Sequence, residues 1–502
     1  MSVRSLLRHA RNQHALRSTV ATAAVAVVVV ATAGAAQAAV VPISVDTFTD
    51  TVGQHASQVE PDSFAFGSTI VTAVQTGRWF NGGSSGIAVS RSGDGGATWT
   101  TKNLPNLTNN PSPDNPTPGI WDRVSDPVVA YDARHNVWMV STLPLVGRST
   151  TVGPTAAGVY TSRSTDGGIT WGAPVFVTGS NLQSPDKNWI VCDNTATSPF
   201  YGNCYTEWDA NGDGNRIYMS TSTDGGLTWG PRRRPSNNAT GIGGQPVVQP
   251  NGTVIVPIDN ANETTLRSFR STNGGTSWSN ATTITTISHH TVAGGLRTGP
   301  LPSAEIDATG RVFVAWQDCR FRTGCTANDI VFVTSTNGTT WSTVQRVPID
   351  AVTSGRDHFI PGLAVDRTTS GATTRLALAY YFYPAASCTV ATCQLSVGYV
   401  SSTNAGATWS APSTLAGPMS LSWLPATTQG PMVGDYISTS FVGAKPVPVF
   451  VRAQAPAGSV LDQSMVAETG LSTARAGAVR SQSTPRSVVP GTGSARGAFV
   501  RR

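Results

Sequence analysis

The chain has 502 residues, and only 12% of them are charged. Its formal net charge of +6 comes from its two ends, because removing the four arginines before residue 39 and the six after residue 468 leaves 24 basic against 28 acidic groups. The slightly acidic middle of the chain excludes a nucleic-acid role inferred from overall charge alone.

The first 38 residues have the pattern of a secretion signal. Arg4, Arg8, Arg11 and Arg17 precede an apolar run over residues 20–30, and Ala36-Gln37-Ala38 supplies small residues for cleavage. The apolar run is too short and too rich in alanine to favour a stable membrane span. We therefore expect a signal peptide over residues 1–38 and a secreted, extracellular protein, with a retained signal anchor as the alternative.

One short phrase, Ser-x-Asp/Asn-x-Gly-x-Thr-Trp with small variations, recurs six times. The copies begin at Ser92, Ser164, Ser222, Ser271, Ser335 and Ser402, and their tryptophans are 72, 58, 49, 63 and 68 residues apart. A turn phrase that returns at intervals of about 50–70 residues indicates a repeat architecture.

Each phrase predicts a hairpin turn with a structural role. Its glycine permits positive φ, its Asp or Asn accepts hydrogen bonds within the turn, and its tryptophan packs against a neighbouring strand. Asn replaces Asp in three copies, at Asn273, Asn337 and Asn404. Because Asn cannot act as a carboxylate, the phrase is not expected to be catalytic.

These phrases resemble the Asp-box (BNR) repeats of secreted bacterial sialidases and related β-propellers, from Ser92 to Trp409. The resemblance implies an all-β fold of four-stranded antiparallel blades. A second, weaker repeat of apolar strands with polar starts occurs seven times, near residues 60, 126, 186, 245, 305, 357 and 435. We therefore favour seven blades, with six as the alternative.

The predicted propeller spans residues 39–468. Its last unit lacks an Asp box, and residues 43–49 are expected to supply that unit's missing strand and close the ring. Residues 469–502 contain six arginines and no acid, and we expect them to form a disordered basic tail.

Six cysteines form three close pairs: Cys192 with Cys204, Cys319 with Cys325, and Cys388 with Cys393. An even number in an exported chain predicts disulfides, and each pair brackets one hairpin loop. The spacing does not match a zinc site.

Candidate functional residues gather in loops at the propeller end opposite the Asp boxes, which we call the mouth. Clustered carboxylates there would raise one another's pKa values, as glycoside hydrolysis requires. The candidate catalytic residues are Asp126, Asp186, Glu305, Asp357 and Tyr436. The candidate substrate-binding residues are Arg123, Arg297, Arg320, Arg322, Trp121 and His358. In the alternative interpretation, the acids bind backbone amides or pair with Arg123 and Arg297.

The sialidase resemblance implies three arginines on the substrate carboxylate, an Asp acid/base, and a Tyr nucleophile helped by Glu. The Phe/Tyr-Arg-Ile-Pro motif that carries the family's first arginine is missing, and no motif identifies the nucleophile. The family's catalytic residues therefore have no assigned counterparts here.

Asp209, Asn211 and Asp213 match the first half of a calcium loop, but Ser220 stands where the bidentate Glu belongs. A plain hairpin is the alternative, so Ca²⁺ is an optional ligand and no cofactor is expected to be required.

The sequence thus predicts a monomeric, secreted, sialidase-like glycoside hydrolase acting on terminal sugars of a glycan or glycoconjugate. A non-catalytic glycan- or protein-binding propeller is the alternative, and another carbohydrate-active enzyme such as a lyase is a third.

Overall fold

The computed structural model describes residues 40–115, 117–179, 184–473 and 479–483, so the predicted signal peptide lies outside it. The described residues form an all-β protein. Their helical elements are five 3-10 turns: η1 (Asn211–Asp213), η2 (Ala293–Gly295), η3 (Thr323–Cys325), η4 (Gly371–Thr373) and η5 (Leu421–Trp423). None of the helices among these residues has the length and hydrophobicity needed to cross a membrane.

Five sheets have three or four antiparallel strands each. They comprise β11 (Pro185–Cys192), β12 (Cys204–Ala210) and β13 (Arg216–Ser222); β14 (Val247–Val248), β15 (Val254–Asp259), β16 (Thr265–Ser271) and β17 (Thr282–Thr286); β18 (Ser303–Ile306), β19 (Val312–Asp318), β20 (Asp329–Ser335) and β21 (Gln345–Arg346); β22 (His358–Val365), β23 (Leu376–Phe382), β24 (Gln394–Ser402) and β26 (Ser413–Ser420); and β29 (Ser438–Val442), β30 (Lys445–Ala453), β31 (Gln463–Glu468) and β1 (Val40–Pro42).

A further sheet has nine strands: β2 (Gln54–Phe66), β3 (Thr69–Arg78), β4 (Ser84–Ser92), β5 (Thr100–Asn103), β6 (Arg123–Asp132), β7 (Val137–Val146), β8 (Thr155–Ala156), β9 (Gly158–Ser164) and β10 (Val175–Gly179). Within it, β2–β5 and β6–β10 are separate meanders, joined by the single residue pair Ser84 and Val124. Two short pairs complete the fold: β25 (Thr408–Trp409) with β32 (Val479–Arg480), and β27 (Ala426–Thr427) with β28 (Gly430–Pro431).

The β-propeller prediction is confirmed, but the predicted blade count is not. Five sheets stand alone as blades of three or four strands, whereas the prediction was seven four-stranded blades, or six. The difference arises where Ser84 and Val124 pair, because that contact continues hydrogen bonding from one meander into the next. Sequence periodicity marks meanders and cannot report such lateral pairing.

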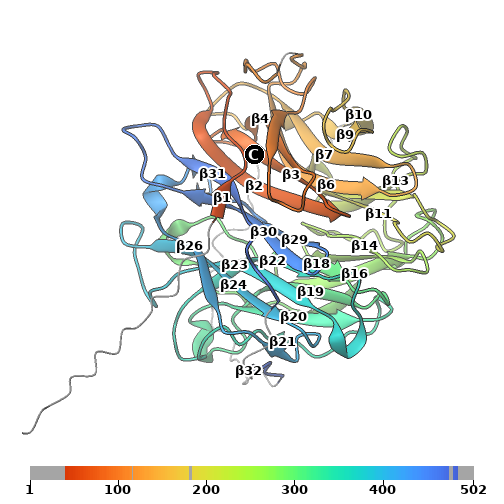
Figure 1. Cartoon of the computed structure of the whole chain (residues 1–502), viewed down its shortest axis with the longest axis vertical. Coiled ribbons are helices and arrows are strands. Elements are labelled where there is room, and N and C mark those ends of the chain that lie inside the picture. Colours follow the sequence, from red (N-terminus) through yellow and green to blue (C-terminus); the bar gives the residue numbers. More distant parts are fainter. Residues whose placement is uncertain (1–39, 116, 180–183, 474–478, 484–502) are drawn as a thin grey trace, which may run out of the picture. The chain divides into compact units, whose positions relative to one another are not determined.

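The first strands of successive meanders form a closed ring. In chain order β2, β6, β11, β14, β18, β22 and β29 each contact the next, and β29 contacts β2. Figure 1 shows the first and last parts of the described chain, red and blue, side by side. We call the line enclosed by these seven inner strands the axis.

The closing strand, Val40–Pro42, lies immediately before the residues 43–49 that were predicted to form it. Val40–Pro42 pairs with β31, and the amide of Ile43 donates to the carbonyl of Met465 at 3.0 Å. Residues 43–49, predicted to form this strand, are instead irregular after that bond, and Phe48 is buried against Gly86.

The Asp-box phrases form the predicted hairpin turns. In the first copy, Ser92 Oγ donates to Asp94 Oδ1 at 2.8 Å, and the amide of Thr98 donates to the same oxygen at 2.9 Å. Gly96 at the fifth position has φ 94°, which a residue with a side chain rarely adopts. The turn joins the third and fourth strands of its meander, at the end where the inner strand finishes.

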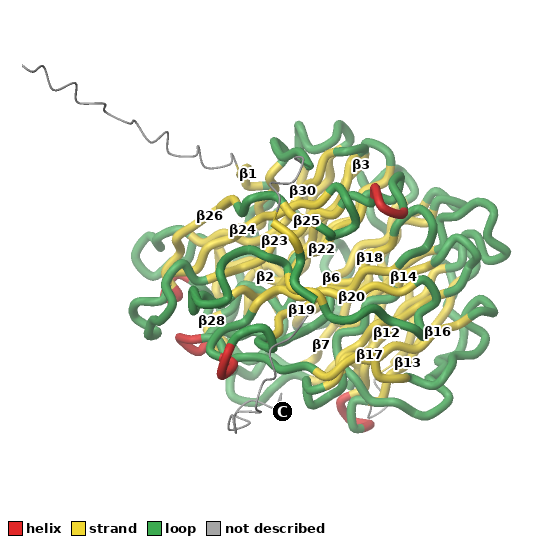
Figure 2. Tube along the Cα trace, turned by 90° about the horizontal axis from the view of Figure 1, so that it is seen from below, coloured by secondary structure: helices red, strands yellow, loops and turns green. Residues whose placement is uncertain are grey.

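All three predicted disulfides are present, each within its own pair. The predicted disordered tail is described only in part, and its residues Val479–Arg480 pair with Thr408–Trp409 of the last Asp box. Figure 2 shows how loops, in green, join the yellow strands at the surface, with the helical turns confined to short red segments.

Strands in the middle of each sheet are buried on both faces. In β19, Val312, Val314 and Trp316 pack into one apolar cluster, while Phe313 and Ala315 pack into the next. Successive side chains of a strand point to opposite faces, so one apolar run fills the spaces on both sides of its sheet.

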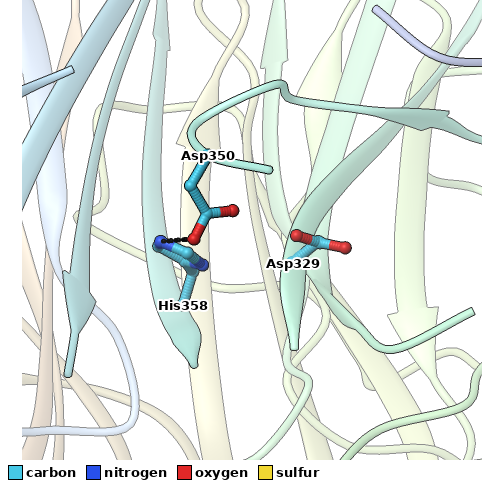
Figure 3. A group of neighbouring side chains, drawn as sticks. All are labelled: Asp329, Asp350 and His358. Atoms are coloured by element: carbon cyan, nitrogen blue, oxygen red, sulfur yellow. Dashed lines mark ion pairs between the residues drawn. The ribbon is translucent and has the colours of Figure 1, made fainter. Parts of the chain in front are cut away.

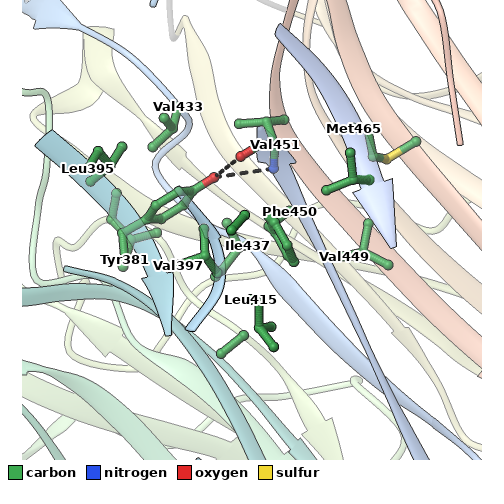
Figure 4. Packing of buried hydrophobic residues seen from close by; sticks show 14 of the residues in the cluster. Tyr381, Leu395, Val397, Leu415, Val433, Ile437, Val449, Phe450, Val451 and Met465 are labelled. Carbon is green, nitrogen blue, oxygen red and sulfur yellow. Dashed lines mark hydrogen bonds between the residues drawn. The ribbon is translucent and has the colours of Figure 1, made fainter. Parts of the chain in front are cut away.

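The largest apolar cluster contains a buried tyrosine that links two sheets. Tyr381 on β23 is fully buried, and its hydroxyl donates to the carbonyl of Val451 on β30 at 2.8 Å. The same hydroxyl accepts from the amide of Val451 at 3.2 Å. Figure 4 shows both bonds among the surrounding apolar side chains.

We expect Tyr381→Phe to lower the free energy of unfolding by about 1–3 kcal/mol, because it leaves both backbone groups of Val451 buried without their partner. Urea denaturation measures this change. The matched control is Tyr160→Phe, whose ring is partly exposed, and equal losses in the two variants would contradict the assignment.

Candidate functional site

Three inner strands carry a charged residue at the same local irregularity. In β2, β6 and β11 the strand register shifts, and Glu60, Asp126 and Lys187 lie there with φ of 57°, 49° and 50°. Such β-bulges re-aim side chains and occur often beside functional sites. The three charged groups meet on the axis, where Asp126 and Lys187 lie near the starts of their strands and Glu60 lies in the middle of β2.

Lys187 is the centre of this group, which we call the axial cluster. Its ammonium lies 3.6 Å from a carboxylate oxygen of Glu60 and 3.7 Å from one of Asp126, and it also donates to Asp435. The three carboxyls come from three different segments of the chain. All four residues are buried, so the ammonium has exchanged water for carboxylates.

Two arginines extend the axial cluster. Arg297 forms a bidentate pair with Asp435, with its Nε at 2.7 Å and an Nη at 2.5 Å. Arg78 donates to Gln75 at 2.9 Å, and the amide of Gln75 donates to Glu60. Three cations thus share three carboxyls, which leaves the fully ionised cluster neutral.

The electrostatic balance assigns different protonation states to the acids. Burial raises the pKa of Glu60 to about 8, helped by Asp126 and Asp435 and opposed by Lys187. Burial would also raise the pKa of Asp435, but Arg297 and Lys187 hold it well below its usual range. At neutral pH, therefore, Asp435 is ionised, Glu60 carries a proton, and the cluster has a net positive charge.

Tyr436, one of the candidate catalytic residues, lies beside the axial cluster. Its hydroxyl donates to the carbonyl of Pro127 at 3.1 Å, and its ring contacts Trp189 with centroids 5.2 Å apart. Burial, then the charges of Glu60 and Asp126, raise its pKa well above the usual value. The phenol therefore keeps its proton at neutral pH.

Other predicted acids lie outside the axial cluster. Asp186 accepts from the amide of Asn211 at 3.2 Å. Asp357 accepts from the amide of Asn328 at 2.7 Å and pairs with His290 at 3.1 Å. Glu305 lies toward the opposite end of the axis and pairs with Arg367 at 3.1 Å.

Arg123 and Trp121, predicted to bind substrate, are packed into the protein. Arg123 is fully buried and donates to the carbonyls of Gly82, Gly147 and Ser149, while its guanidinium lies 4.3 Å from the ring centre of Trp79. Trp121 packs on Tyr160 with ring centroids 4.6 Å apart. Both side chains hold the loops of the mouth together.

Arg320 and Arg322 are likewise committed to internal pairs. Arg320 contacts Asp318 at 2.7 Å. Arg322 is buried and contacts Asp329 at 2.6 Å and Asp350 at 2.8 Å.

His358, Asp329 and Asp350 form a group with ligand atoms within 4.8 Å of one another (Figure 3). These residue types can bind a metal ion. However, Arg322 and Arg346 each contact both aspartates at 2.6–2.8 Å. The positive charge that a metal would bring is already present, so this group fits a buried ion-pair network better than a metal centre.

The three predicted calcium ligands are spread over one turn. Asp209 accepts from Asn215 at 3.0 Å, and Asn211 donates to Asp186. Asp213 accepts from Arg216 at 2.9 Å and from the hydroxyl of Tyr218 at 2.7 Å. These contacts tie the turn to its neighbours.

The sequence interpretation missed Glu60, Lys187, Gln75 and Arg78 as site residues. A signal was present for Glu60, which precedes a proline at a strand start as Asp126 does. Lys187 and Arg78 carried no such signal, because their convergence depends on the ring closing.

Residues 153–360 match the family described as BNR repeat-like domain. Over these residues the chain is similar to BNR-repeat proteins. The family resemblance predicted from the six phrases is thereby confirmed. No curated protein matches the sequence.

Several solved structures are similar to this chain at low identity. A protein of unknown function from Dyadobacter fermentans is 14% identical, with a TM-score of 0.46 over 72% of this chain and 98% of its own. An ulvan lyase of polysaccharide lyase family PL25 is 9% identical, with a TM-score of 0.47 over 87% and 96%. The NanB sialidase of Streptococcus pneumoniae is 12% identical, with a TM-score of 0.42 over 85% and 70%. None of these likenesses bears on activity.

Lys187→Met is expected to destabilise the propeller by about 3–5 kcal/mol, because it leaves buried carboxylates without their shared cation. Thermal or urea unfolding at pH 7 measures the loss. Lys445→Met, at an exposed position on β30, is the control. A loss no larger than the control's would show that the ammonium is not the centre of the cluster.

The pKa of Glu60 predicts a pH-dependent contribution to stability. Its folded value of about 8 exceeds the unfolded value of 4.5. The contribution is fully present below pH 4.5 and is lost as pH rises through about 8. We expect Glu60→Gln to gain stability relative to the wild type between pH 5 and 9 in urea denaturation. A constant difference across that range would contradict the assigned protonation state.

Proposed function

We propose that this protein is a sialidase-like glycoside hydrolase that acts on a terminal anionic sugar at the mouth end of the axis. The observation that carries the proposal is the axial cluster, in which acids, cations and a tyrosine meet from segments distant in the chain. The low-identity structural neighbours do not contribute to the argument.

Glu60 is the proposed general acid. With a pKa of about 8 it holds a proton at neutral pH, which is the state needed to protonate a leaving-group oxygen. Its Oε1 atom is buried and has no hydrogen-bond partner among the described residues. A protonated oxygen of this kind could donate to a substrate.

Arg297 is the proposed site for the sugar carboxylate. Its side chain is 14% exposed, against 5% for Lys187, so it is the more accessible of these two cations. The pair with Asp435 shows that Arg297 can bind a carboxylate by donating two parallel hydrogen bonds to it. A substrate carboxylate would share or replace that contact.

Asp126 and Tyr436 complete the proposed machinery. Asp126 lies 3.7 Å from the ammonium of Lys187 and is the proposed second carboxylate. Tyr436 can act as a nucleophile only after its hydroxyl has lost its proton. The negative charges of the neighbouring acids raise the pKa of this hydroxyl and so oppose that loss. We therefore assign Asp126 the role of base in that step.

A non-catalytic glycan-binding propeller is the second candidate. One observation favours it: Asp435 already occupies the guanidinium of Arg297, and Lys187 is neutralised by internal carboxylates. Such a cluster could hold the inner strands in place while glycan binds at the surrounding loops without turnover.

Export from the cell and a monomeric state belong to the same proposal. Three disulfides suit an oxidising compartment. The proposed chemistry uses side chains of this chain alone and requires no cofactor.

The test is turnover of a panel of fluorogenic glycosides that includes sialosides. We expect Glu60→Gln to lower kcat by at least about 100-fold and Arg297→Lys to act mainly by raising KM for a carboxylated substrate, because lysine lacks the bidentate geometry. The control is Arg375→Gln, at a partly exposed pair with Asp366.

Wild-type turnover that survives both cluster substitutions would contradict the proposed site. Saturable glycan binding by the wild type with no turnover of any glycoside would instead support the binding candidate.

A further inference from the structure

A cavity opens at the Asp-box end of the axis, opposite the axial cluster. Its volume is about 550 Å³, which lies within the range of about 300–1,000 Å³ of small-molecule sites. Its walls are formed by the C-terminal ends of inner strands, at the end of the propeller where the Asp boxes also lie. Its lining includes Ser63, Phe64, Phe66, Glu305, Ala308 and Arg367.

The cavity shares no lining residue with the axial cluster. A smaller hollow of about 50 Å³ shares Ser63, Phe64 and Glu305 with it and reaches Asp62 and Trp189 deeper along the axis. Trp189 in turn contacts the ring of Tyr436, which lies beside the axial cluster. Two aromatic rings therefore stand between the two ends, and a ligand at one end is separate from a ligand at the other.

The charged groups that line the cavity have an acidic excess, because Glu305, Asp307 and Asp366 outnumber Arg367. Glu305 and Arg367 form an ion pair at 3.1 Å, and both line the cavity. Asp307 and Asp366 also line it, but their carboxylates accept hydrogen bonds within their own turns, from Thr309 and Thr368. The Glu305–Arg367 pair thus presents donors and acceptors without net positive charge.

Hydroxyl groups and aromatic faces also line the cavity. Ser63 Oγ lies 2.9 Å from the hydroxyls of both Ser438 and Ser440. Phe64 lies under the guanidinium of Arg367 at 5.3 Å, and Phe66 is 43% exposed. Small polar donors beside apolar ring faces match the alternation of hydroxyls and C–H surfaces on a sugar.

We propose that the cavity at the Asp-box end is a second, non-catalytic carbohydrate site that binds a neutral mono- to trisaccharide. A neutral ligand fits because the guanidinium of Arg367 is already balanced by Glu305, and Asp62 adds a further acid deeper in the axis. An anionic sugar would meet this acidic excess in a partly enclosed space, where charge repulsion is strong.

The test is binding of a panel of neutral di- and trisaccharides to the full-length protein by isothermal titration calorimetry. We expect Ala308→Trp, at an exposed residue of the lining, to fill the cavity and weaken binding by at least about tenfold, the equivalent of about 1.4 kcal/mol. Phe66→Ala should weaken it by about 3- to 10-fold through loss of the ring face.

The matched control is Phe80→Ala, because Phe80 is 45% exposed and does not line the described cavity. It should leave saccharide affinity unchanged. Glu60→Gln should also leave it unchanged, so failure of the mouth proposal and failure of this one are distinguishable.

The proposal is overturned if no neutral saccharide binds below millimolar concentration. It is equally overturned if binding persists at full affinity in Ala308→Trp, or if anionic sugars alone bind and Arg297→Lys abolishes that binding.

Discussion

The ammonium of Lys187, held among three carboxyls, is the interaction on which the centre of the molecule depends. Its partners are Glu60 on β2, Asp126 on β6 and Asp435 just before β29, and Arg297 reaches Asp435 from the loop before β18. Five segments that are far apart in the chain are thereby tied around the axis. A buried group of this kind is costly unless every charge is paired, so it constrains how the inner strands can be placed.

The same cluster carries the chemistry that we propose for the mouth. Because Asp435 is ionised while Glu60 is protonated at neutral pH, two buried carboxyls a short distance from one ammonium take opposite states. Separated pKa values of this kind are how one site supplies both an acid and a base. A carboxylated ligand would have to displace Asp435 from Arg297. If the ligand displaces it, the hydrolytic proposal is favoured, and if the pair stays intact, the binding proposal is favoured.

Local features of the fold were predictable, and convergent ones were not. The Asp-box turns and the three disulfides involve neighbours in the chain, so spacing was enough to predict them. The prediction of the blade count was wrong because one residue pair, Ser84 and Val124, joins two meanders through a lateral hydrogen-bonded contact.

Asp126, Arg297 and Tyr436 were predicted as site residues and do lie together. Lys187 was missed because its partners lie up to 248 residues away. Arg123 was predicted to bind substrate at the mouth, but its guanidinium donates its hydrogen bonds to backbone carbonyls of the loops. The cavity at the Asp-box end left no trace in the sequence, since its lining residues come from many strand ends.

The most direct measurement is a crystal structure of the protein with a planar, carboxylated sugar analogue of the kind that inhibits sialidases. The account predicts the ligand carboxylate on the guanidinium of Arg297, with the carboxylate of Asp435 shifted aside and Glu60 within hydrogen-bond distance of the ring or its leaving-group position. An analogue bound elsewhere, with the Arg297–Asp435 pair undisturbed at full occupancy of the ligand, would contradict it.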